Sequence, residues 1–105
     1  MNVNAETDTE GYLKDLADWT PVVAEQLALA CQITMTEAHW EVIRVLRTFY
    51  QDTDVSPAMR PFVKLVREGL GQEKGNSIYL MQLFGESPAK TAALVAGLPK
   101  PSNCL

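Results

Sequence analysis

The residue with the clearest chemical potential is Cys104, the second-last residue of the sequence. It follows the segment 97–101, Gly-Leu-Pro-Lys-Pro, in which a glycine and two prolines are typical of a helix end and an extended exit. An extended segment projects its side chains instead of burying them. From Gly97 to Cys104 it would reach about 20 Å at about 3.1 Å per residue. The sequence therefore predicts an arm, residues 97–105, that carries a thiol to another protein.

Nucleophilic chemistry at a cysteine requires an accessible thiolate. Cys104 has access by its position, but the carboxylate of Leu105 is one residue away and disfavours the thiolate. Three cations are candidates to compensate, because they match positions of the family whose resemblance is described below: Lys100 on the arm, Lys90 in the last predicted helix and Arg60 further upstream. Each could equally be a solvated surface charge. Cys104 itself could be an idle thiol in a frayed tail.

The remaining residues of chemical interest favour structural roles. Cys31 falls near the end of a predicted helix, where a free cysteine packs as a small hydrophobe, and nothing in the sequence places it next to Cys104 for a disulfide. His39 is the only histidine, and we expect it to be packed or hydrogen-bonded, with a base or ligand as the alternative. Two cysteines and one histidine at these spacings do not make a zinc site.

Helices are the elements that must position these residues. Three dipeptides place a capping hydroxyl before a proline at the first helical position: Thr20-Pro21, Ser56-Pro57 and Ser87-Pro88. Another helix is predicted to begin after Thr36, because Met35 and Trp40 would then form a hydrophobic staple, with Thr34 as the alternative cap.

The pattern predicts a mainly α fold, an orthogonal bundle of about five helices near residues 21–32, 37–51, 57–69, 76–84 and 88–96. The second is apolar around most of its circumference, so we expect it at the centre of the bundle. A small β-hairpin in the N-terminal segment is plausible on its pattern. The expected organisation is a single domain, 1–105, made of an N-terminal segment (1–19), a helical body (20–96) and a mobile arm (97–105).

Composition limits the compartment and the partners. The chain has 105 residues, 47% of them hydrophobic, which is enough for one small core. No apolar run approaches the ~20 residues of a membrane span, and no signal segment is expected. Two widely separated cysteines indicate a reducing cytoplasm. The net charge of −4 argues against independent binding to RNA or DNA.

The ending 96–101, Ala-Gly-Leu-Pro-Lys-Pro, followed by Cys104 resembles the TusE/DsrC family of small bacterial sulfur-carrier proteins. Further matches run in one order from about residue 10 to the end: Glu10-Gly11-Tyr12-Leu13, Trp19-Thr20, His39-Trp40, Arg47-x-Phe49-Tyr50, Ser56-Pro57-Ala58-x-Arg60, Tyr79-Leu80-x-x-Leu83-Phe84 and Pro88-Ala89-Lys90. The resemblance implies a helical bundle preceded by a hairpin. Members of the DsrC type carry a second arm cysteine where this chain has Ala93, so the chain resembles the single-cysteine TusE type.

This resemblance implies a cytoplasmic carrier of the sulfurtransferase type. Cys104 would accept persulfide sulfur and pass it to an enzyme that forms 2-thiouridine in tRNA. The implied partners are a TusBCD-like sulfur-donor complex and an MnmA-like tRNA thiouridylase, which would hold the tRNA. The carrier itself would need no cofactor and no metal. Two alternatives stay open: a DsrC-like partner or substrate of a sulfite-reductase-type system, and a non-catalytic binding module whose tail docks on a partner.

Overall fold

The computed structural model describes residues 5–101. Its elements are η1 (Leu16–Asp18), α1 (Pro21–Ala30), α2 (Glu37–Thr53), α3 (Met59–Leu70), α4 (Ser77–Phe84) and α5 (Pro88–Val95). The mainly α fold is therefore confirmed, and the expected hairpin is reduced to one isolated antiparallel bridge between Thr7 and Leu13. None of the helices in this part of the chain is long and apolar enough to cross a bilayer.

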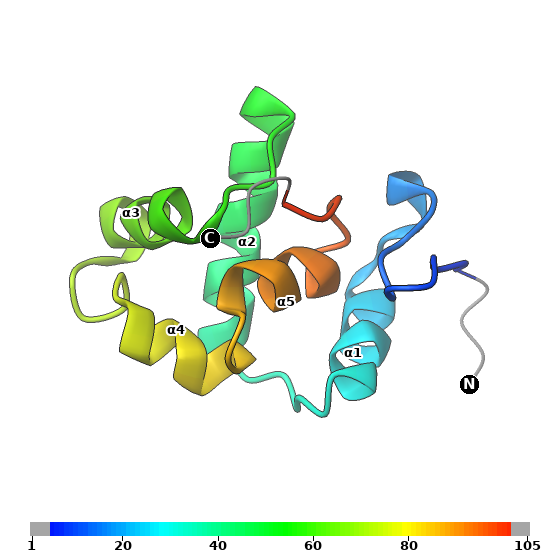
Figure 1. Ribbon diagram of the computed structural model, residues 1–105, viewed down its shortest axis with the longest axis horizontal. Helices are drawn as coiled ribbons and strands as arrows, with labels where there is room; N and C mark the ends of the chain where they lie inside the picture. The colour runs from blue at the N-terminus through cyan, green and yellow to red at the C-terminus, as the bar shows by residue number, and fades with distance from the viewer. Residues whose placement is uncertain (1–4, 102–105) are drawn as a thin grey trace.

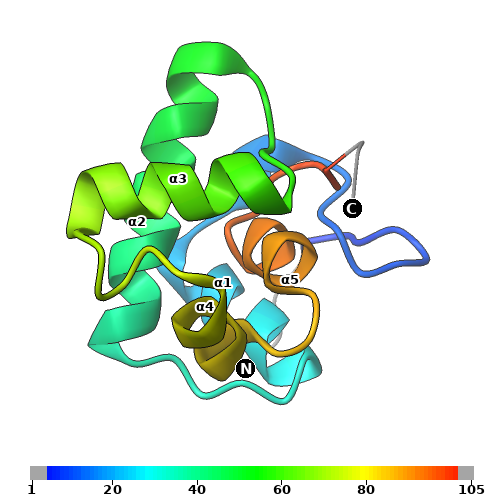
Figure 2. The same cartoon turned by 60° about the vertical axis from the view of Figure 1, so that its left-hand side comes forward.

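The central element is α5, and not the second helix as the sequence suggested. It contacts all four of the other α-helices, and Figure 1 shows it between α1 and α4. In Figure 2, α3 crosses α2 on the far side of the bundle from α1. The reason lies in side-chain size. The buried residues of α5 are mostly alanines, which allow neighbouring helices to approach closely. The larger core side chains come from the surrounding helices, and include Ile43, Leu46, Phe62, Leu80 and Phe84.

Two of the three proline-marked helix starts are confirmed. Pro21 and Pro88 are the first residues of α1 and α5, and Thr20 Oγ1 accepts a hydrogen bond of 3.1 Å from the amide of Val23. The third start was wrong: α3 begins at Met59, after the N-cap Ala58. Pro61 explains the shift, because its missing N–H falls in the first turn of a helix that begins at 59 but would interrupt one that begins at 57.

His39 has the structural role that the sequence predicted. Thr36 is the N-cap of α2, and its amide donates to Nδ1 of His39 over 3.1 Å. Nδ1 is therefore the acceptor nitrogen, and Nε2 carries the proton that it donates to the carbonyl oxygen of Leu83, 2.8 Å away. One imidazole thus joins the start of α2 to the end of α4 and satisfies a carbonyl left unpaired there.

Candidate functional site

The described part of the arm begins in a C-terminal cap and stays on the body of the protein. Gly97 has φ 73°, its amide donates to Leu94 over 3.1 Å, and the amide of Leu98 donates to Ala93 over 2.9 Å. These two bonds form a Schellman motif, which uses glycine because a left-handed residue is required. The Leu98 side chain is 3% exposed, and Pro101 is fully buried.

Two side chains from distant parts of the chain hold the end of α5. Trp19 donates from Nε1 to the carbonyl oxygen of Val95 (2.9 Å), and Arg47 donates from Nη1 to that of Ala96 (2.6 Å). The guanidinium carbon of Arg47 lies 3.8 Å from the centre of the Trp19 ring, a cation–π contact. Burial lowers the pKa of Arg47. Carbonyls that a helix end leaves unpaired are thus bonded, and the direction in which the chain leaves α5 is fixed.

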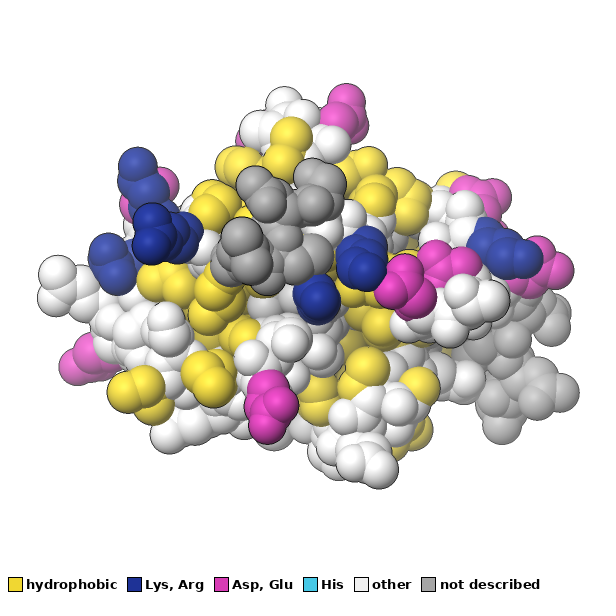
Figure 3. Space-filling model, in the orientation of Figure 1, with side chains coloured by type: hydrophobic (Ala, Val, Ile, Leu, Met, Phe, Trp, Pro, Cys, Tyr) yellow, Lys and Arg dark blue, Asp and Glu magenta, His cyan; other side chains and the backbone are white. Residues whose placement is uncertain are grey.

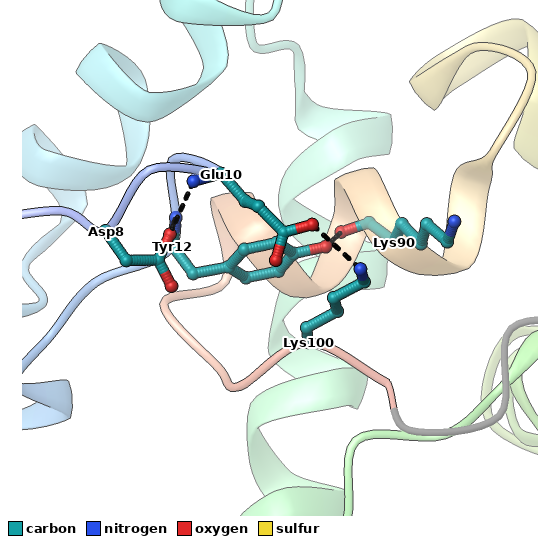
Figure 4. A network of polar contacts seen from close by, with 5 residues as sticks. All are labelled: Asp8, Glu10, Tyr12, Lys90 and Lys100. Carbon is teal, nitrogen blue, oxygen red and sulfur yellow. Dashed lines mark hydrogen bonds and ion pairs between the residues drawn. The ribbon is translucent and has the colours of Figure 1, made fainter.

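The N-terminal segment makes a second set of contacts with α5 and the arm (Figure 4). The hydroxyl of Tyr12 donates to the carbonyl oxygen of Lys90 over 3.2 Å, and Nζ of Lys100 lies 2.8 Å from Oε2 of Glu10. Asp8 Oδ1 accepts from the amides of Glu10 (2.9 Å) and Tyr12 (3.0 Å), which shapes the turn between them. Residues 8–12 therefore hold both the start of α5 and Lys100.

These contacts correct the prediction that the arm projects from Gly97 onward. Residues 97–101 lie against the body, because Leu98 and Pro101 gain more from burial than an extended segment gains from solvation. Cys104 lies outside the described residues. The chain length limits its distance from the described part: two residues separate it from Pro101, and the three Cα–Cα steps span at most about 11 Å.

A cavity of about 330 Å³ adjoins the last described residue. Its lining is drawn from the start of α3, the exposed side of α4, the start of α5 and the arm: Met59, Ser77, Met81, Glu86, Ser87, Pro88, Ala89, Lys90 and Pro101. Cys104 is thus tethered to one wall of this cavity, which makes the cavity and its rim the candidate functional site.

The three predicted supporting cations occupy different positions around this site. Lys90 is half-buried and lines the cavity. Lys90 and Lys100 together line a smaller neighbouring hollow, but Lys100 is paired with Glu10, and in Figure 4 the ammonium group of Lys90 points away from that pair. Arg60 is exposed in the first turn of α3, next to Met59, and does not line the cavity. The structure therefore brings Lys90 to the site, turns Lys100 towards Glu10 and leaves Arg60 outside the lining.

The sequence did not reveal the roles of Trp19, Arg47 and Glu10. Each of them belongs to one of the segments that resemble the TusE/DsrC family, and this resemblance was the signal that could have identified them. Their partners are two backbone carbonyls and a lysine, which lie 49 to 90 positions away in the sequence. Contacts between such distant positions do not follow from local patterns.

Cys31 is the C-cap of α1 and is half-buried. Burial raises the pKa of its thiol, so its nucleophilic thiolate form is disfavoured. It shares a cavity with His39, whose two ring nitrogens are both occupied by structural hydrogen bonds. Within residues 5–101, no group of three or more histidines, cysteines and carboxylates is placed to hold a metal ion.

The chain is similar to known proteins over almost its whole length. A family model described as "DsrC like protein" matches residues 1–105. Sulfurtransferase TusE of Photorhabdus laumondii is 52% identical over 100 residues, which cover 95% of this chain and 90% of that protein. TusE of Escherichia coli is 48% identical over 100 residues, covering 95% and 92% of the two chains.

Solved structures of DsrC proteins share the fold. The NMR structure of Allochromatium vinosum DsrC has a TM-score of 0.87 and 46% identity, covering 96% of this chain and 90% of that one. The crystal structure of the oxidized γ-subunit of dissimilatory sulfite reductase (DsrC) from Archaeoglobus fulgidus has a TM-score of 0.82 and 37% identity, covering 96% and 92%. The chain belongs to the DsrC-like protein family.

Proposed function

We propose that this protein is a sulfur carrier in the relay that leads to 2-thiouridine in tRNA, and that Cys104 carries the sulfur. The relatives named sulfurtransferase TusE, 52% and 48% identical over 95% of this chain, support the carrier function. The observation that supports the role of Cys104 is its tether. It lies three residues beyond Pro101, which is anchored beside a cavity at the end of a helix held by Trp19 and Arg47.

The proposed chemistry is a displacement at sulfur. The thiolate of Cys104 attacks the outer sulfur of a donor's cysteine persulfide, the donor's S–S bond breaks, and the donor leaves as a thiolate. The proton stays on the transferred sulfur, so Cys104 becomes a persulfide. In the second transfer an acceptor thiolate attacks that outer sulfur and Cys104 leaves as a thiolate. Neither step changes the net oxidation state, so no external oxidant or reductant is needed.

The proposed partners follow from the relay. A TusBCD-like complex would supply the persulfide, and an MnmA-like thiouridylase would accept the sulfur and hold the tRNA. A carrier with net charge −4 is poorly suited to hold a polyanion by itself, which supports delivery through this enzyme. We place the relay in the cytoplasm, as the cysteine usage indicates.

The DsrC-like alternative needs a second thiol on the arm. The position that would carry it is Ala93, which is 1% exposed in α5 and accepts the Schellman hydrogen bond from Leu98. Cys104 therefore cannot form an internal disulfide with this position, because alanine has no sulfur. This observation favours the single-cysteine carrier over a role in a sulfite-reductase-type system.

Mass measurement after incubation with a persulfide donor tests the proposal. We expect the chain to gain the mass of one sulfur atom, and we expect Cys104→Ser to abolish the gain while the matched control Cys31→Ser retains it. In cells, Cys104→Ser should fail to support tRNA thiolation. If Cys104→Ser still supports thiolation, the carrier role is wrong and a tail that docks without chemistry is favoured.

A further inference from the structure

The short tether limits where partner proteins can bind, and this inference rests on the proposed function. Because the Cys104 Cα stays within about 11 Å of the Pro101 Cα, the cysteine of any donor or acceptor must come close to Pro101. A carrier with a long free arm could reach a cleft far from its own body. With this tether, the partner has to contact the surface that surrounds Pro101.

Close to this surface, α4 exposes apolar side chains to solvent. Ile78 is 72% exposed and Met81 is 43% exposed, and residues three apart lie on the same side of a helix. Met81 and Met59 line the cavity together with Pro101. Figure 3 shows hydrophobic side chains exposed over α4 on this face of the molecule. Among the exposed large hydrophobic residues that the structure describes, Met81 lines the cavity and Ile78 lies about one turn from it on α4. Val22, Leu29 and Val55 neither line the cavity nor belong to α4.

The charges on this surface favour a protein over a nucleic acid. The cavity lining contains one cation, Lys90, and one carboxylate, Glu86, so their charges offset one another. A phosphate backbone is bound by several cations acting together. An apolar centre with a mixed polar rim is instead typical of protein–protein interfaces.

We propose that the α4 face, defined as Ile78 and Met81 with the cavity residue Met59, is a docking surface shared by the sulfur donor and the sulfur acceptor. Each partner would place an apolar rim around its reactive cysteine against this face. Both partners need the same tethered thiol, so they occupy the face in turn and exclude one another. The carrier therefore shuttles between two complexes and does not bridge them.

Charge substitutions on the exposed side of α4 test this surface. Ile78→Glu and Met81→Glu place a carboxylate at positions that are solvent-exposed in the free protein, and Leu29→Glu on α1 is the matched control, with Leu29 64% exposed. We expect each α4 variant to weaken binding to the purified donor complex and to the purified thiouridylase by about tenfold or more, and to slow sulfur transfer at subsaturating partner. Leu29→Glu should stay within about twofold of wild type. Unchanged melting temperatures establish that the variants are folded.

The outcomes separate this inference from the proposed function. If wild-type Cys104 cannot be loaded by a small-molecule persulfide donor, the carrier function fails whatever the binding data show. If loading succeeds but both α4 variants bind and transfer like wild type, the docking surface is wrong. Weakening towards one partner only, or a ternary complex of donor, carrier and acceptor in sedimentation, overturns the shared use of the face. A wild-type dimer that Ile78→Glu dissociates would assign the face to self-association instead.

Discussion

We propose that Lys90 influences the thiol of Cys104. Its half-buried side chain lines the cavity to which Cys104 is tethered, and no carboxylate among the described residues pairs with it. A nearby positive charge favours a thiolate, so its removal raises the pKa of the thiol.

We expect Lys90→Gln to raise the pKa of the Cys104 thiol, because a nearby positive charge favours the thiolate. The rate of alkylation against pH, measured in a Cys31→Ser background, reports this value, and the mutation should slow alkylation near neutral pH. Lys64→Gln is the control, because Lys64 is exposed on α3 and does not line the cavity. Lys100→Gln should have a smaller effect because Lys100 is paired with Glu10. If Lys90→Gln and Lys64→Gln show the same dependence of alkylation rate on pH, Lys90 does not influence the Cys104 thiol.

The thiol of Cys31 should be less reactive at neutral pH than a carrier thiol. Burial raises its pKa in the folded protein. In a Cys104→Ser background, we expect its alkylation to become fast only above the ordinary thiol pKa of about 8.5. The stability gained by keeping this thiol neutral is complete below the unfolded pKa and is lost as pH rises through the folded pKa. Rapid alkylation of Cys31 at neutral pH would contradict the burial argument.

Among the elements, the junction between α5 and the arm is the most sensitive to substitution. Gly97 has positive φ, and an added Cβ would overlap the ring of Trp19. We expect Gly97→Ala to lower the free energy of unfolding by about 3 kcal/mol or more, from left-handed strain and from the overlap together. Thermal unfolding measures the sum of the two effects, and fluorescence in a Trp40→Phe background, where Trp19 is the one remaining tryptophan, reports the overlap.

Gly85→Ala is the control for this junction. Gly85 also has positive φ, but an added Cβ meets nothing within 4 Å. It should therefore lose about 1–3 kcal/mol through backbone strain while the emission of Trp19 is unchanged. Equal losses and equal fluorescence in the two variants would show that Trp19 does not restrain the arm.

Local sequence signals predicted the helices well, but they did not indicate that residues 97–101 pack against the body. The starts of α1, α2 and α5 follow from Thr20, Thr36 and Pro88, because capping acts within one turn. The start of α3 was misplaced because two prolines compete within five residues and only one of them can lie in the first turn. The burial of Leu98 and Pro101 was not predicted, because proline favours an extended backbone but does not indicate whether the segment is buried. Pro101 lines a cavity together with residues of α3, α4 and α5, so its burial depends on segments that are distant in the sequence.

For the molecule as a whole, the excess of carboxylates should prevent stable binding to tRNA alone. The net charge of −4 opposes a polyanion, so we expect the purified chain to bind tRNA with a Kd weaker than about 100 µM at physiological salt. Filter binding or anisotropy with labelled tRNA measures this, and association should appear once the thiouridylase is added. Tight, salt-dependent binding of the chain by itself would contradict this expectation.

The hydrogen bonds from Tyr12 to Lys90 and from Trp19 to Val95 join the N-terminal segment to α5. During synthesis the ribosome makes α1 and α2 long before α5, so their hydrophobic faces emerge without the element that covers them. Folding of the nascent chain therefore cannot finish until α5 has left the exit tunnel. Until then, the incomplete chain exposes apolar surface to which chaperones bind. A stalled or truncated product that lacks α5 should be degraded by proteases.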